Sequence, residues 1–419
     1  MPQFTILNDR RFWLFFAFAL TLAGFPLHIL LNWIASGDAY ALPLHPGGAD
    51  FLNFWVASQT ALHGDAAHLY DPASYSAILI DRYGSDFDYR WLYPPHFLFF
   101  LLPLGLMPYW TAFTVFMVTT LALFALVGSQ FFSSRHSILW LAFAPSSVLT
   151  IIMGQASLLI GTIFITAVFL WDRRPILCGI LIGLLTIKPH FGVLLPIVLL
   201  IERRWLIIMV ASATTTALVI LSALLFGADA WTGFLGNLGS AQGDVLRTSG
   251  SLLTAQVTPF GAVRYAGASL ETAWLVQLVC TLLAVLAAAT AALSSARRDT
   301  KAAIIIFATC LAVPYVLVYD LVAPTFAALF LFLGEDRNEA PGLGLSFLLV
   351  VLIDFSFLNG WIAAGENGVE IGPVILAALV IALLVRARRE DTKQHRGDGD
   401  KRVPEQIAHP FSLADEAKV

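Results

Sequence analysis

The sequence has few charged residues and few cysteines for its length. Only 12% of its 419 residues are Asp, Glu, Lys or Arg, whereas 58% are hydrophobic, and the mean hydropathy is +0.79. A water-soluble protein of this size needs more polar surface, so most of the surface must face lipid. The three cysteines, Cys178, Cys280 and Cys310, lie in apolar segments without CxxC spacing. That placement argues against a disulfide framework or a structural zinc site.

Other absences narrow the function further. The formal net charge is −4 and the 24 basic residues are scattered between apolar runs, which makes nucleic acid an unexpected partner. No GxGxxG or GxxxxGKS loop is present. The acidic residues show no convincing metal-ligand spacing. We therefore predict no cofactor and no metal site, and a lipid bilayer as the obligatory partner.

Six apolar runs are long enough to cross a bilayer as single helices. They lie at residues 12–34, 108–131, 205–226, 271–296, 341–358 and 371–387. The first is longer than the apolar core of a signal peptide and lacks a cleavage pattern after it, so we expect it to stay as the first span.

Three further apolar stretches, at 137–171, 175–201 and 301–334, are each interrupted near the middle by polar, Pro or Gly residues. Each half is short for a full crossing, and such breaks are tolerated in a membrane only where they meet protein or water. We therefore predict three broken hairpins whose tips line one functional cavity. The chain is then an all-α polytopic membrane protein with about twelve membrane segments.

Basic residues fix the predicted orientation, because short cytoplasmic loops are enriched in Lys and Arg. The residues used are Arg10, Arg11, Arg135, Arg173, Arg174, Arg203, Arg204, Arg297, Arg298, Lys301, Arg337, Arg386, Arg388 and Arg389. They place both termini in the cytoplasm of a plasma (inner) membrane protein, and two long loops, 35–92 and 227–270, outside with the hairpin tips. Residues 1–387 form the membrane domain. Residues 388–419 are charged and mixed in sign, which predicts a disordered cytoplasmic tail.

The first outside loop is predicted to contain helices. Asp50 follows a Gly-rich turn where a helix N-cap would stand, and Phe and Trp residues recur after it at helical spacing as far as Gly64. A second short helix is expected over 73–83. Residues 91–95, WLYPP, then return the chain to the membrane.

Asp50 is the strongest candidate for chemistry. Transfer of a sugar from a lipid phosphate to a hydroxyl needs one carboxylate to take the hydroxyl proton. The departing phosphate needs fixed cationic or N–H donors. Lys188, at the tip of an apolar hairpin, is the best outside cation for that role. The alternatives are that Asp50 is only a helix cap and that Lys188 only extends its ammonium to the interface.

Weaker candidates surround these two. Arg90, Arg264 and His190 could also bind the donor phosphate, with ordinary rim charges or a helix cap as the alternative. Five polar residues are assigned to sugar or acceptor binding, with capping and interhelical hydrogen bonds as the alternative. They are Asn53, Tyr93, Gln155, Tyr319 and Asp320.

Several segments together resemble a known family. They are GADFLNFWVASQTALHGDAAHLYDPASY, WLYPPHFLFFLLPLGLMPYW, GQASLL, LCGILIGLLTIKPHFGVLLP and VPYVLVYDL. In this order and spacing, roughly over 45–330, the chain is similar to the family 87 glycosyltransferases. The resemblance implies a GT-C fold, a polyprenyl-phosphate sugar donor, mannose as the sugar, and inversion at the anomeric carbon.

The resemblance also implies roles for single residues. The family's catalytic Asp falls on Asp50, its Tyr-Pro-Pro turn on 93–95, its Gly-Gln on 154–155 and its Lys-Pro on 188–189. Members close to the mannosyltransferases often carry His where this chain has Tyr319 and Asp320, which leaves the sugar open. The acceptor is expected to be an envelope glycan or glycolipid.

Two other classes of function compete with an inverting hexosyltransferase. A transporter or flippase of lipid-linked sugars would also have broken helices around a cavity. The long first outside loop, however, has no counterpart in the second half of the chain, as related transporter halves would require. A non-catalytic envelope assembly protein would leave Asp50 as a cap.

Overall fold

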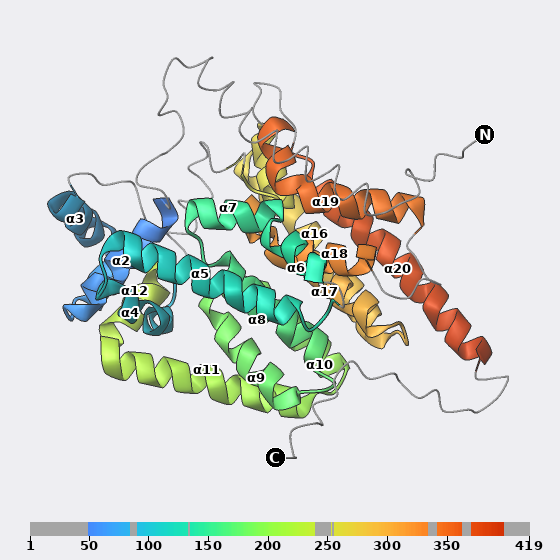
Figure 1. The fold of residues 1–419 in the computed structure, drawn as a ribbon, viewed down its shortest axis with the longest axis horizontal. Helices are drawn as coiled ribbons and strands as arrows, with labels where there is room; N and C mark the ends of the chain where they lie inside the picture. Colours follow the sequence, from blue (N-terminus) through green and yellow to red (C-terminus); the bar gives the residue numbers. More distant parts are fainter. Residues whose placement is uncertain are drawn as a thin grey trace.

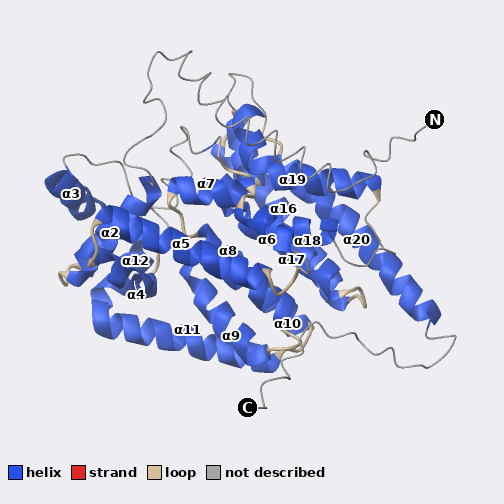
Figure 2. Cartoon of the chain, viewed as in Figure 1, coloured by secondary structure: helices blue, strands red, loops and turns tan. Residues whose placement is uncertain are grey.

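The structure of the protein is a computed structural model that describes residues 49–83, 90–132, 135–238, 253, 255–333, 342–362 and 370–397. Within these ranges the regular elements are helices, as Figures 1 and 2 show, and one β-bridge joins Gln256 to Leu317. The predicted all-helical class is confirmed for this part of the chain. The predicted first span at 12–34 lies outside the described residues.

Short helices gather at one end of the molecule, on the left in Figure 1. They are α2 (Ala49–Leu62), η2 (Ala66–Tyr70), α3 (Pro72–Tyr83), η3 (Pro95–Phe97), α4 (Leu98–Gly105) and α12 (Ala228–Asn237). The two helices predicted for the first outside loop are therefore present as α2 and α3. Asp71 caps α3, because its carboxylate accepts a hydrogen bond from the Ser74 backbone N–H at 2.9 Å.

Three helices among the described residues are long and apolar enough to cross a membrane. They are α5 (Tyr109–Gly128), α11 (Trp205–Phe226) and α16 (Leu270–Leu293). Each coincides with a predicted span. The helices α19 (Leu343–Ile362) and α20 (Gly372–Gly397) occupy the last two predicted spans. These apolar helices support a membrane protein.

The three interrupted stretches each hold helices on both sides of an interruption. The first holds α6 (Arg135–Ala142), α7 (Pro145–Met153) and α8 (Ser157–Leu170). The second holds α9 (Pro175–Leu184), η4 (Leu185–Ile187), η5 (Pro189–Gly192) and α10 (Leu195–Ile201). The third holds α17 (Arg298–Ala312), η6 (Val318–Leu321) and α18 (Val322–Leu333). The third interruption lies at 313–317, however, and the predicted break residues Tyr319 and Asp320 fall inside a short helical turn after it. An additional break before Pro145, between α6 and α7, was not predicted.

Local chemistry explains each break. Gly154 ends α7 in the left-handed conformation with φ 73°, which a glycine adopts without a steric penalty. Lys188 is not helical, with φ −128° and ψ 75°, because Pro189 disfavours the helical conformation of the residue before it. In the third stretch Val313 leaves the helix just before Pro314.

The long helix α11 packs against α9 through two glycines. Gly179 and Gly183 lie one turn apart on α9, and a Cβ added at either would come within 2.6 Å of the Cβ of Val210 or of Thr214 on α11. Small residues four apart let two apolar helices approach closely in a membrane, where dispersion contacts drive helix association. The sequence GILIG therefore sets the position of α11.

Replacing Gly183 by Val is expected to destabilise the protein by about 1 to 3 kcal/mol, because the added methyl groups overfill the contact with Thr214. Thermal unfolding of the detergent-solubilised chain measures the loss. Gly236→Ala on α12 is the control, since a Cβ there meets nothing within 4 Å. Equal unfolding temperatures for the two variants would contradict the close packing.

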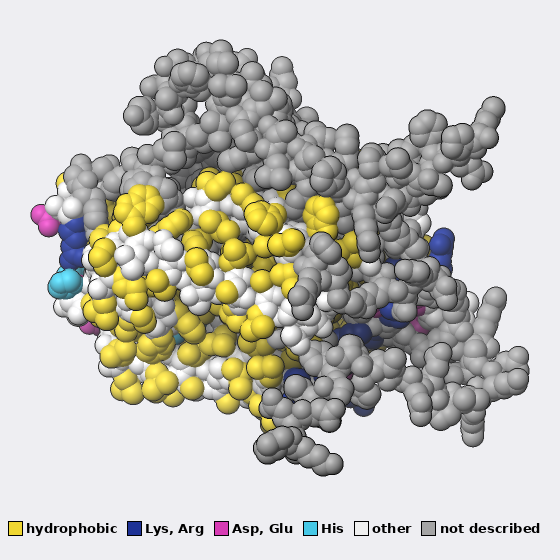
Figure 3. Space-filling model, in the orientation of Figure 1, with side chains coloured by type: hydrophobic (Ala, Val, Ile, Leu, Met, Phe, Trp, Pro, Cys, Tyr) yellow, Lys and Arg dark blue, Asp and Glu magenta, His cyan; other side chains and the backbone are white. Residues whose placement is uncertain are grey.

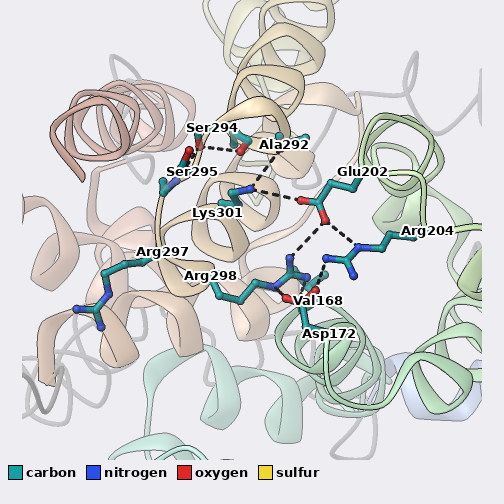
Figure 4. Close-up of polar contacts among 12 residues, drawn as sticks. Val168, Asp172, Glu202, Arg204, Ala292, Ser294, Ser295, Arg297, Arg298 and Lys301 are labelled. Carbon is teal, nitrogen blue, oxygen red and sulfur yellow. Dashed lines mark hydrogen bonds and ion pairs between the residues drawn. The ribbon is translucent and has the colours of Figure 1, made fainter. Parts of the chain in front are cut away.

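Charged residues at the ends of four helices form an ion-pair network, shown in Figure 4. Glu202, after α10, lies 3.2 Å from Arg204 Nε, 3.7 Å from Arg298 Nη1 and 3.6 Å from Lys301 Nζ. Asp172, after α8, pairs with Arg204 and lies 3.4 Å from Arg298 Nε. The turns after α8 and α10 and the start of α17 therefore meet at one end of the molecule. All three were predicted to be cytoplasmic.

The helix α20 continues beyond 387, where the tail was predicted to begin. Its polar part packs against the start of α17: Glu390 accepts hydrogen bonds from Arg386 at 2.8 Å and from Thr300 at 3.1 Å, and from the Arg297 backbone N–H at 3.0 Å. These contacts keep the segment helical as far as Gly397. The rest of the predicted tail lies outside the described residues.

The surface agrees with a membrane setting. In Figure 3 hydrophobic side chains cover the middle of the visible face, and charged side chains are seen toward its left and right ends. A large share of α11 and α16 is exposed and apolar, including Leu224 at 79% and Leu293 at 76% exposed. Such a belt between two charged ends suits a bilayer core.

The orientation prediction can be tested directly. Reporters fused after Arg135, Arg204 and Arg298 are expected to lie in the cytoplasm, and reporters within 35–92 and 227–270 outside, because the basic residues cluster in the first set of connections. Accessibility to a membrane-impermeant label gives the side for each reporter. A cytoplasmic reporter within 35–92 would contradict the predicted location of Asp50.

Candidate active site

The tip of the first broken hairpin meets helix α2, which lies in the loop predicted to be outside. The Gln155 side-chain N–H donates to the Asp50 carboxylate at 2.8 Å and to the Tyr319 hydroxyl at 3.3 Å. The Tyr93 hydroxyl donates to Gln155 Oε1 at 3.2 Å. Residues from three separate segments therefore converge on the amide of a fourth, and this convergence supports the prediction that the tips lie together.

The tips of the second and third hairpins meet through a buried ion pair. Lys188 Nζ lies 2.6 Å from Asp320 Oδ1, and the two side chains are 8% and 0% exposed. The Ser157 hydroxyl donates to the same oxygen at 2.5 Å, and the Leu317 backbone N–H lies 3.4 Å from the other. Asp320 therefore satisfies the charge of Lys188, which the sequence alone left without a partner.

The position of Asp50 differs from the predicted N-cap. Asp50 lies inside the first turn of α2, which begins at Ala49, and its carboxylate accepts from Gln155. The neighbouring Phe51 and Phe54 are fully buried and make edge-on ring contacts with the aromatic residues of α5 and with Tyr93. That packing fixes the rotation of α2 about its axis and so turns Asp50 toward the hairpin tips.

Burial raises the pKa of Asp50 above its ordinary value, and the hydrogen bond from Gln155 and the charge of Lys188 partly offset the effect. The Tyr319 hydroxyl also favours the charged form, whereas Asp320 opposes it. A carboxylate with a raised pKa is a better proton acceptor than an ordinary Asp, so this environment suits a general base.

Comparison with known families decides the class of the protein. The sequence matches Glycosyltransferase family 87 over residues 91–319, more than half of the chain. The chain belongs to glycosyltransferase family 87. Neither a curated protein nor a solved structure matches the sequence. As a glycosyltransferase the chain acts on a sugar donor and an acceptor in a membrane environment, and of the three classes considered above, family membership favours the enzyme.

Three of the predicted site residues of this glycosyltransferase make contacts outside the two clusters. The Asn53 amide accepts from Tyr75 and donates to the backbone carbonyl of Arg90 at 3.3 Å. Arg264, on α15 (Pro259–Tyr265), donates to the Ala268 carbonyl at 2.7 Å. The described side-chain contacts of Asn53 and Arg264 are therefore with residues other than Asp50 and Lys188.

His190 lies near the Lys188–Asp320 ion pair. It lies two residues after Lys188, its ring contacts that of Phe191, and it interacts electrostatically with Lys188 and Asp320. Its buried Nε2 has no hydrogen-bond partner. Because an unpartnered buried nitrogen costs free energy, this ring nitrogen is a candidate contact for a bound ligand.

Sequence reasoning missed two residues of the site in this glycosyltransferase. Ser157 bonds to Asp320, and its only sequence signal is the position two residues after Gln155, within the GQAS segment. Tyr315 interacts electrostatically with Asp50 and Asp320. Its signal was the Pro-Tyr turn at 314–315, which interrupts an apolar run. Among the described residues, no group of three His, Cys, Asp or Glu side chains could hold a metal ion.

Proposed function

We propose that this glycosyltransferase moves a hexose, with mannose as the first candidate, from a polyprenyl-phosphate donor to a hydroxyl of an envelope glycan or glycolipid. The single observation that carries the proposal is the meeting of Asp50, Lys188 and Asp320 at one place from three distant parts of the chain. Asp50 interacts electrostatically with Lys188 and Asp320, and a base with a cation near it is what transfer from a sugar phosphate needs.

One carboxylate is sufficient for the proposed sugar transfer. Asp50 accepts the proton of the acceptor hydroxyl while the acceptor oxygen bonds to the anomeric carbon. The bond from that carbon to the phosphate oxygen breaks, and the polyprenyl phosphate leaves with the electron pair. Because the acceptor attacks from the face opposite the phosphate, the anomeric configuration inverts.

Lys188 is proposed to stabilise the leaving phosphate. Its ammonium has three N–H groups, of which Asp320 takes one at 2.6 Å, so two remain for phosphate oxygens. The rings of Phe191 and Tyr319 lie 5.6 and 5.8 Å from the ammonium and exclude water around it. An N–H to phosphate bond is stronger in such a site than in water. Arg90, Arg264 and His190 are secondary candidates for the same phosphate.

The hydroxyls of Tyr93 and Tyr319 are the proposed contacts to sugar or acceptor hydroxyls. Each makes one hydrogen bond with Gln155 and, as a phenol, can both donate and accept. Asn53 lies on α2 one turn after Asp50 and is proposed for the acceptor side. We further propose that the site faces the outside of the plasma membrane, with both termini of the chain in the cytoplasm.

A transfer assay tests the proposal. The full chain in lipid nanodiscs is given labelled polyprenyl-phosphate-mannose, or the glucose analogue, with octyl α-mannoside and a membrane glycolipid extract as acceptors. The proposal expects label on an acceptor and an equal amount of free polyprenyl phosphate. A flippase would instead move the intact donor between leaflets of proteoliposomes. Intact donor in every reaction would overturn the proposed function.

A further inference from the structure

Gln155 is fully occupied by hydrogen bonds inside the protein. Its Oε1 accepts from the Tyr93 hydroxyl at 3.2 Å and from the Ala156 backbone N–H at 3.3 Å. Its Nε2 donates to Asp50 at 2.8 Å and to Tyr319 at 3.3 Å. A side-chain amide has two acceptor and two donor positions, so none is left for a sugar or acceptor hydroxyl.

The orientation of this amide is fixed by chemistry. An ionised carboxylate only accepts hydrogen bonds, so the nitrogen of Gln155 and not its oxygen must face Asp50. The side chain is 7% exposed and sits directly after the left-handed Gly154, at the start of α8. A buried amide with four partners has one rotamer available, and its nitrogen therefore holds the Asp50 oxygen at one position.

We propose that Gln155 is the positioning residue of the base: it does not bind substrate but holds the Asp50 carboxylate ionised and aimed, and Tyr93 and Tyr319 hold Gln155 in turn. This inference rests on the proposed function of Asp50 as the proton acceptor, and it changes the role that the sequence suggested for Gln155. Positioning by a saturated amide preserves the geometry of the base between turnovers, when no substrate is present.

The charged and titratable groups that interact with Asp50 set the background for any titration. They are Lys188, Asp320, Tyr319, Tyr93 and Tyr315. None of them is changed by a substitution of Gln155, so a shift in the Asp50 titration in that variant reports the lost hydrogen bond. Gln155 lowers the pKa of Asp50, so its removal must raise that pKa further.

Infrared difference spectroscopy can follow Asp50 without any substrate. Spectra of the full chain recorded across pH, with the Asp50→Asn spectrum subtracted, contain the carboxyl band of this one residue. Gln155→Met keeps the length of the side chain and removes all four hydrogen bonds. We expect the Asp50 midpoint to rise by about one to two pH units in Gln155→Met. Tyr93→Phe, which removes only the hydroxyl that holds Gln155, should raise it by less.

Gln277→Met is the matched control. Gln277 is 3% exposed and is similarly engaged, with bonds to Phe260 N at 3.1 Å, Leu311 O at 3.0 Å and Thr281 at 3.2 Å. Replacing Gln277 by Met removes a comparable set of buried hydrogen bonds away from Asp50. The control should leave the Asp50 midpoint in place. An unchanged midpoint in Gln155→Met, in protein that stays folded, would overturn the inference.

Kinetics separate positioning from substrate binding. With labelled polyprenyl-phosphate-mannose and octyl α-mannoside, Gln155→Met should lower kcat by about 10- to 100-fold and move the acid side of the pH profile upward, with both KM values unchanged. A raised KM with an unmoved pH profile would instead make Gln155 a substrate ligand and overturn the inference. Full activity of Asp50→Asn would overturn the proposed function, whatever the infrared midpoint shows.

Discussion

Asp50→Asn is expected to lower sugar transfer by about 10²- to 10⁴-fold, because an amide cannot take the acceptor proton. The substitution keeps the size of the side chain. Asn also serves as well as Asp near a helix N-terminus, so α2 should stay intact. Initial rates with labelled polyprenyl-phosphate-mannose measure the effect, and the yield of folded protein after gel filtration shows that membrane insertion is normal. Retention of most of the activity would leave Asp50 with a structural role only.

The pH dependence of the wild-type enzyme gives a second check on Asp50. The base must be ionised to act, and burial raises its pKa above the ordinary value. Transfer should therefore fall on acidification, beginning at a higher pH than an ordinary Asp would give, and should recover as the pH rises through the raised pKa. A rate that stays constant down to the ordinary pKa of Asp would contradict this environment.

Lys188→Ala is expected to slow sugar transfer. It should remove about 2 to 4 kcal/mol of transition-state stabilisation, the usual effect of losing one electrostatic donor. The same change leaves the fully buried carboxylate of Asp320 without its cation. Breaking one side of a buried ion pair costs about 3 to 5 kcal/mol of stability, so the single variant should also unfold more easily. Rates at saturating donor and thermal unfolding of the purified chain measure the two effects.

A double variant separates these two effects. In Lys188→Ala with Asp320→Asn the uncompensated charge is gone, while the amide can still accept the hydrogen bond from Ser157. The double variant should recover most of the lost stability and none of the lost transfer. If transfer recovers along with stability, Lys188 acts only as the partner of Asp320 and the cation for the phosphate must be sought elsewhere.

Sequence patterns were sufficient for the helices and their interruptions because both are local. The ends of α11 follow from the Arg pair at 203–204 and from Gly227, which bracket an unbroken apolar run. The breaks at Gly154 and Lys188 follow from a glycine and from a residue before proline inside apolar stretches. The break before Pro145 was missed although a signal is present: Pro145 and the two serines after it mark a helix start inside the apolar stretch.

Residue type and position led to the selection of Asp50 and Lys188, whose roles stay predictions. A carboxylate in a helix predicted to lie outside and a lysine at the tip of an apolar hairpin are each costly to bury, which makes a functional role a reasonable hypothesis. By the same reasoning Arg264 was selected, and its guanidinium donates to the Ala268 carbonyl four residues away. A charged residue near a turn is too common a pattern to distinguish a substrate-binding residue from an ordinary surface charge.

The sequence by itself determined which segments are apolar helices, where they break, and which polar residues stand at the breaks, since all of these depend on neighbours within a few positions. Only the tertiary structure decided the partners. Gln155 meets Asp50 across 105 residues, and Lys188 meets Asp320 across 132. Such pairings depend on how α2, the three hairpin tips and their buried aromatic residues pack, and side-chain packing over that separation leaves no periodic trace in the sequence.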